Sequence, residues 1–256
     1  MLLIAVLLTG TAWALGGMRA ATRAPVGLLC GFVFVVHGCQ LAAERRPLRS
    51  LHPASLAPWP FLGVGLLNLF FVSPVPWLGW SDFWIWLQAA GIFVVVLNGV
   101  RAPGPRLALF ACLVALALAG VLLACYQRFL APTWLPFGRE QVPQFVGRAS
   151  GFFGIPNSLA AFLLLLLPAS LALAVRGAAT ARVAWGWIAT VLGLGLVFTL
   201  SRGAWLSLAG AILAWPILAA GDRRRRVARR FGLAVIAVLA LAAATYFLAP
   251  GARARI

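Results

Sequence analysis

The stretch "LALFACLVALALAGVLLAC", residues 107–125, decides the fold, because it contains no charged side chain over 19 consecutive residues. A transmembrane helix needs about 20 mostly apolar residues to cross roughly 30 Å of hydrocarbon. The whole chain has the same character, since 63% of its residues are hydrophobic, 10% are charged and its mean hydropathy is +1.01. These values are too apolar for a soluble domain. The sequence therefore predicts an integral membrane protein.

Runs of this kind recur along the chain. A weaker one, 55–73, begins among prolines, which are tolerated at a helix start. The period-2 alternation of a lipid-facing barrel strand appears nowhere. We therefore predict an all-α fold, a polytopic bundle of about nine transmembrane helices that forms a single membrane domain over residues 1–256. With 55–73, the predicted spans are 1–17, 26–43, 83–100, 107–125, 157–175, 183–200, 203–220 and 231–249.

Arginines predict the orientation, because all 21 basic residues of the chain are Arg. With nine spans, 13 of them fall in loops on one side, which the positive-inside rule places in the cytoplasm. The N-terminus is then cytoplasmic, and the loop 126–156, Arg202 and residues 250–256 lie on the outer side of the membrane. If 55–73 does not span, the first half of the chain reverses and the second half does not. The arginine-rich loops are 44–50, 101–106, 176–182 and 222–230.

The charged and sulfur-containing residues exclude several function classes. The formal net charge is +17, but arginines at helix ends are typical topology determinants and contacts for anionic lipid, so we expect no nucleic-acid partner. The four carboxylates are too scattered for a paired-carboxylate hydrolase or a two-metal enzyme. The four cysteines lie in apolar runs without C-x-x-C spacing. We expect neither a metal nor a cofactor. These residues are Glu44, Asp82, Glu140, Asp222, Cys30, Cys39, Cys112 and Cys125.

Other residues allow two interpretations each. The tryptophans of "SPVPWLGWSDFWIW", residues 73–86, are typical of an interfacial aromatic belt, and a sugar-stacking platform is the alternative. Arg128 and Arg139 lie on the predicted outer side, where snorkelling explains them without a ligand. The polar residues inside predicted spans that could serve a carrier are His37, Gln40 and Asn98.

Arg148 precedes a predicted helix start in "RASGFFGIPNSLAAFLLLLLP", residues 148–168. Pro156 ends any preceding helix, and Asn157 stands where an N-cap would begin the next one. The stretch would bring an arginine and a helix N-terminus together, and free N–H groups at such an end attract phosphate. A capped membrane helix without a ligand is the alternative.

Arg202 stands in "VFTLSRGAWLSLAG", residues 197–210, between two predicted spans. A guanidinium near the membrane boundary is costly unless it snorkels or is paired. Its planar fork stays charged and suits bidentate phosphate binding better than Lys would. Ser201 and Arg202 are therefore candidate ligands for a phosphate group.

The two stretches "SGFFGIPNSLAAFLLLLLP" and "LVFTLSRGAWLSL" resemble the signature of the O-antigen ligase and polymerase superfamily, within residues 148–215. Oligosaccharyltransferases that glycosylate proteins also belong to it, and its members have about a dozen helices and a long periplasmic loop. The resemblance implies a bacterial inner membrane, with residues 250–256 and the rest of the outer side in the periplasm. It also implies metal-independent glycosyl transfer at the periplasmic face, as in lipopolysaccharide biosynthesis. The donor would be a polyprenyl-pyrophosphate-linked glycan, and the acceptor a hydroxyl on lipid A core sugar, a growing glycan or a protein.

The resemblance also implies roles for individual residues. Arg202, in the Ser-Arg-Gly turn with Ser201, would hold the donor pyrophosphate, and Arg148 and Asn157 would support it. Ile155 departs from the Asn-Pro-Asn that the family often shows. The family's activating histidine and a further arginine lie in the long loop after the ninth helix, where this chain ends.

We therefore expect the N-terminal portion of such a glycosyltransferase, with no catalytic residue of its own. One alternative is a bicarbonate-like anion transporter of the same superfamily. Another is an inert, truncated reading frame.

Overall fold

The computed structural model describes residues 20–44, 51–176 and 178–218, together with Ile4, Gly10, Leu233 and Ile236. Six of its helical segments are long and apolar enough to cross a membrane, which confirms a helical membrane protein. The predicted spans 1–17 and 231–249 lie outside the described residues, apart from those four single positions.

The described helices follow the predicted runs closely. The 55–73 run, weak in the sequence, is a 3-10 turn followed by a helix, and together they form one of the six membrane-length segments. The helix before Ser201 and the helix after it are separate elements, as predicted. The bounds are α2 Ala20–Ala43, η2 Pro53–Leu56, α3 Pro58–Phe71, α4 Pro76–Gly99, α5 Pro103–Phe129, α6 Pro156–Arg176, α7 Ala179–Thr199 and α8 Arg202–Leu218.

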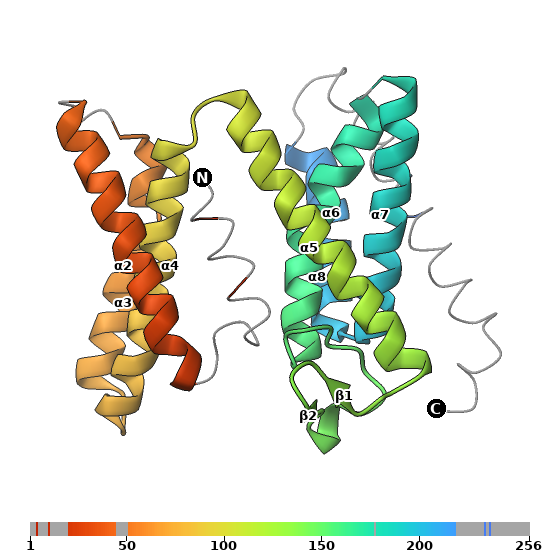
Figure 1. Cartoon of the computed structure of the whole chain (residues 1–256), viewed down its shortest axis with the longest axis horizontal. Helices are drawn as coiled ribbons and strands as arrows, with labels where there is room; N and C mark the ends of the chain where they lie inside the picture. The colour runs from red at the N-terminus through yellow and green to blue at the C-terminus, as the bar shows by residue number, and fades with distance from the viewer. Residues whose placement is uncertain are drawn as a thin grey trace. The chain divides into compact units, whose positions relative to one another are not determined.

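The chain divides into two compact units (Figure 1). Of the described helices, unit 1 contains α2, α3, α4 and the beginning of α5, up to Ala111. Unit 2 contains α5 from Cys112 onward, together with α6, α7 and α8.

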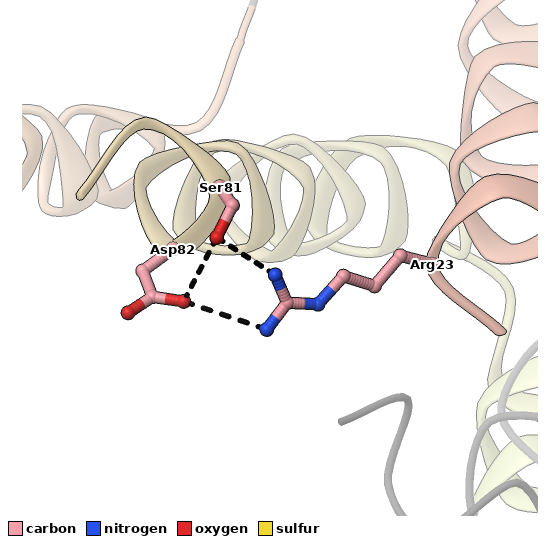
Figure 2. Close-up of polar contacts among 3 residues, drawn as sticks. All are labelled: Arg23, Ser81 and Asp82. Atoms are coloured by element: carbon pink, nitrogen blue, oxygen red, sulfur yellow. Dashed lines mark hydrogen bonds and ion pairs between the residues drawn. The ribbon is translucent and has the colours of Figure 1, made fainter. Parts of the chain in front are cut away.

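In unit 1, two hydrogen bonds fix the helix directions. Arg23, near the start of α2, donates from Nη1 to Ser81 Oγ near the start of α4 at 2.7 Å (Figure 2). At the other end, the Asn98 side chain near the end of α4 accepts from His52 N at 2.8 Å, just before η2. Helices α2 and α4 therefore run in the same direction and α3 runs in the opposite one, and α4 packs against both α2 and α3. These directions agree with 55–73 as a membrane span. If 55–73 did not span, α2 and α4 would be consecutive spans and would run in opposite directions.

In unit 2, glycines allow α5, α6 and α7 to pack closely. A Cβ built on Gly195 of α7 would overlap Val121 of α5, and it would lie 3.1 Å from Leu163 Cδ1 of α6. Leu159 and Leu192 are fully buried in the same core. Lipid tails are as apolar as these side chains, so close backbone approach at small residues is a main source of helix association in membranes.

Residues 130–155 form an ordered segment at one end of unit 2, which we call the loop end (Figure 1). It contains the antiparallel strands β1 Trp134–Leu135 and β2 Arg139–Glu140, and the 3-10 turn η3 Pro143–Phe145. This hairpin is a small departure from the predicted all-α fold. The end of α5, the start of α6, the end of α7 and the start of α8 meet at the loop end.

Candidate functional site

Arg148 joins three elements at the loop end. Its Nε donates to the carbonyl of Thr199, the last residue of α7, at 3.1 Å, and its Nη2 donates to Asn157 Oδ1 at 2.9 Å. The neighbouring Ala149 N donates to Phe198 O at 2.9 Å. The last carbonyls of a helix have no partner within it, and a cation there interacts favourably with the helix dipole. Arg148 therefore satisfies the end of α7 while it holds the start of α6.

Asn157 is not the N-cap of α6, so that part of the sequence prediction is wrong. The helix begins at Pro156, and Asn157 is its second residue. Proline fits the first helical position because it lacks an N–H and its φ is already helical. The amides of Ser158 and Leu159 both donate to Ile155 O, at 3.0 and 3.3 Å. This helix start offers fewer free N–H groups than predicted, and Asn157 serves instead as an acceptor for Arg148.

Arg202 is the first residue of α8, and its side chain is exposed. The turn before it consists of Leu200 and Ser201, and Leu200 adopts a left-handed φ of 50°. Ser201 is buried, with 4% of its surface exposed, and its Oγ accepts from Ala204 N at 3.4 Å, as an N-cap does. Ser201 is thus engaged within the turn, whereas Arg202 points out of it.

The loop end has an unbalanced positive charge. The partners of the Arg148 side chain are uncharged: the oxygens of Thr199 and Asn157 accept its hydrogen bonds, and its Cζ lies 5.8 Å from the centre of the Phe145 ring. Among the described residues, no group accepts a hydrogen bond or ion pair from the Arg202 guanidinium. Two arginines therefore lie at the same end of the bundle without carboxylate partners. Such an arrangement can bind an anion, and the first turn of α8 adds its helix dipole.

Two glutamines that the sequence analysis did not single out position this segment. Gln127 Oε1 accepts from Ser150 N at 2.9 Å and Gly151 N at 2.8 Å. Its Nε2 donates to Gly151 O at 2.8 Å and Trp134 O at 3.2 Å. Gln141 Oε1 then accepts from Ser150 Oγ at 3.0 Å. The sequence could have indicated Gln127, which stands at the end of an apolar run, because a buried side-chain amide needs hydrogen-bond partners.

Arg128 and Arg139 differ from the Arg148–Arg202 pair. Arg128 is buried, with 6% of its surface exposed, and its Nη1 donates to Gly147 O at 2.7 Å. It therefore holds the loop segment and does not snorkel as an exposed arginine would. Arg139 Cζ lies 5.4 Å from the centre of the Phe137 ring, a cation–π contact within the hairpin.

Unit 1 contains the remaining polar residues of interest. Asn98 is buried, and both its side-chain nitrogen and its side-chain oxygen are hydrogen-bonded within unit 1. Its Nδ2 donates to Ser55 Oγ at 2.9 Å and to Val94 O at 2.8 Å, and its Oδ1 accepts from His52 N. This makes it a structural residue of unit 1. The tryptophans of the predicted aromatic belt, Trp77, Trp80, Trp84 and Trp86, are all exposed, between 39% and 74%.

The described residues contain no group of three or more His, Cys, Asp or Glu that could hold a metal ion. Comparison with known proteins gives no match: no family model, no curated protein and no solved structure is similar to this chain.

Proposed function

We propose that unit 2 binds the pyrophosphate of a polyprenyl-linked glycan at Arg202, in an O-antigen ligase-like transfer of that glycan to a hydroxyl acceptor. The reaction would take place at the periplasmic face of a bacterial inner membrane. The observation that carries the proposal is the exposed guanidinium of Arg202, without a partner among the described residues, at the first position of α8.

The chemistry of the reaction requires such a group. When the glycan leaves its lipid carrier, negative charge develops on the pyrophosphate oxygens, and a fixed cation lowers the barrier most when it interacts with that charge. The guanidinium fork can bind two oxygens at once. The buried Ser201 cap and the left-handed Leu200 fix where α8 begins, so the root of the Arg202 side chain is held in place.

Arg148 has a supporting role in this proposal. Its hydrogen bonds to Thr199 O and Asn157 Oδ1 hold the end of α7 and the start of α6 together, and its charge is not neutralised by them. It therefore adds positive potential at the loop end while it positions the turn that precedes Arg202.

We assign donor binding to unit 2, and we do not assign it the general base that would activate the acceptor hydroxyl. The two histidines of the chain, His37 and His52, both belong to unit 1. An anion carrier would need polar groups inside its spans that are free to bind the anion. Two hydroxyls inside α6 and α7 are not free in this way. The hydroxyls of Ser170 and Thr190 donate to carbonyls of their own helices, at 3.0 and 2.9 Å.

The test is binding of a fluorescent polyprenyl-pyrophosphate glycan to the purified chain in lipid nanodiscs. Arg202→Ala should weaken binding by at least about tenfold, since a charge-assisted hydrogen bond contributes about 1.5–3 kcal/mol. Arg202→Lys should recover only part of the loss, because the fork is missing. The matched control is Arg182→Ala, an exposed arginine in the first turn of α7, at the opposite end of that helix.

Three results would contradict the proposal. They are a wild-type chain that does not bind the donor, an Arg202→Ala variant that binds it as the wild type does, and an Arg182→Ala variant that loses binding to the same extent. In the first case, bicarbonate uptake into proteoliposomes would be the next assay.

A further inference from the structure

A cavity of about 240 Å³ lies between α3 and α4 in unit 1. Near the α3–α4 connection it is lined by the polar residues Asn68, Ser73 and Asp82. Further along the helices it is lined by aromatic rings, among them Phe61 and Trp86, whose centres are 5.2 Å apart. The lining therefore changes from polar to apolar along α3 and α4, which belong to two of the membrane-length segments, Pro53–Phe71 and Gly79–Gly99. A lipid has the same gradient, from its headgroup to its chains.

Asp82 gives the polar part of the cavity its chemical character. It is the only acidic residue within the described helices α2 to α8. Its Oδ1 lies 3.6 Å from Arg23 Nη2 and accepts from Ser81 Oγ at 3.4 Å. Figure 2 shows the other carboxylate oxygen pointing away from Arg23. The Asp82 side chain is 60% exposed, so this oxygen can accept a hydrogen bond from a ligand.

Asn68 and Ser73 add two neutral acceptors. Among the described residues, no group hydrogen-bonds the side-chain amide of Asn68 or the hydroxyl of Ser73. A primary ammonium has three N–H donors, as Lys does, which matches one carboxylate oxygen and two neutral oxygens. A trimethylammonium has no N–H to donate, and a carboxylate repels an anionic headgroup.

We propose that this cavity binds one phospholipid with a primary ammonium headgroup, of the phosphatidylethanolamine type. The ammonium lies against Asp82, Asn68 and Ser73, and an acyl chain follows the rings of Phe61 and Trp86. The proposal concerns unit 1 alone and does not depend on donor binding at Arg202.

The test compares lipids that share the same acyl chains. The detergent-solubilised chain is titrated with phosphatidylethanolamine, phosphatidylcholine, phosphatidylglycerol and glucosyl-diacylglycerol, and bound lipid is counted by native mass spectrometry. Phosphatidylethanolamine should bind about tenfold more tightly than the other three, the effect of one charge-assisted hydrogen bond. O-phosphoethanolamine, which has no chains, should not displace it at the same concentration.

Variants assign the preference to the cavity. Asp82→Asn should abolish it, and Asn68→Ala, at an exposed position without a side-chain partner, should reduce it about threefold while the fold is kept. Trp86→Ala should weaken all four lipids equally. Glu140→Gln, in the β2 strand of unit 2, is the control and should change nothing. The proposal would be overturned by equal binding of all headgroups, by tighter binding of the anionic or glycosyl lipid, or by an intact preference in Asp82→Asn.

Discussion

Arg148 and Asn157 are hydrogen-bonded across the junction between the loop segment and α6, with 2.9 Å between Nη2 and Oδ1. The amide of Asn157 accepts this bond without cancelling the charge of the guanidinium. A carboxylate at the same position would pair with Arg148 more strongly and would neutralise it. Position 157 therefore separates the structural role of Arg148 from its electrostatic role.

Asn157→Asp should preserve or raise thermal stability and yet weaken donor binding, because the positive potential at the loop end falls. Asn157→Ala should lower the free energy of unfolding by about 1 kcal/mol, because Arg148 loses one acceptor. The measurements are a thermal unfolding midpoint in nanodiscs and the donor dissociation constant. If the Asp variant bound the donor as well as the wild type, the charge of Arg148 would have no part in binding.

Gln127→Leu should be among the most destabilising single changes at the loop end. It removes two acceptor contacts and two donor contacts to Ser150, Gly151 and Trp134, and leaves buried backbone groups without partners. We expect a loss of about 3 kcal/mol in the free energy of unfolding. Hydrogen exchange should report faster exchange at the amides of Ser150 and Gly151. Unchanged protection of both amides would contradict the role assigned to Gln127.

Gly195→Ala should destabilise unit 2 by about 1–3 kcal/mol, because the added methyl group would overlap Val121 of α5. Gly186 in the same helix has nothing within 4 Å of the corresponding position. There, Gly→Ala should be neutral or should stabilise by about 0.5–1 kcal/mol through helix propensity. Val121→Ala should partly rescue the Gly195 variant. Equal thermal stability of the Gly195 and Gly186 variants would show that the α5–α7 contact is looser than described.

Single cysteines can test the orientation inferred from the arginines. In a variant without the four native cysteines, Arg139→Cys in β2 and Arg182→Cys at the start of α7 lie at opposite ends of unit 2. A membrane-impermeant maleimide added to cells with a permeable outer membrane should label position 139, and should label position 182 only after lysis. The reverse pattern would place the loop end in the cytoplasm.

The positions of the helices could be predicted from the sequence because the membrane imposes a length and a polarity on each span. The run 107–125 is contained in α5, Pro103–Phe129, and 157–175 in α6, Pro156–Arg176. The ends are less well predicted, since a helix continues beyond the hydrocarbon wherever its backbone finds partners. At α6 the prolyl ring moved the start to Pro156 and left Asn157 free to bind Arg148.

The candidate site was only partly predictable. The sequence indicates Arg202 because a charge at a membrane boundary is costly, and Arg148 because it precedes a predicted helix start. The contact between Gln127 and Gly151 joins residues 24 positions apart, and the contact between Arg148 and Thr199 joins residues 51 positions apart. No local pattern encodes such pairs, because they form only when helices from separate parts of the chain come together.

The hairpin between β1 and β2 has a consequence for engineering. Gln127 contacts the segment at Trp134 and again at Ser150 and Gly151, and Arg148 holds its end independently of the hairpin tip. Phe137 and Gly138 at that tip are exposed. A short epitope inserted between them would therefore leave both ends of the segment anchored, and it would give an antibody handle at the loop end without breaking the contacts of Gln127 and Arg148.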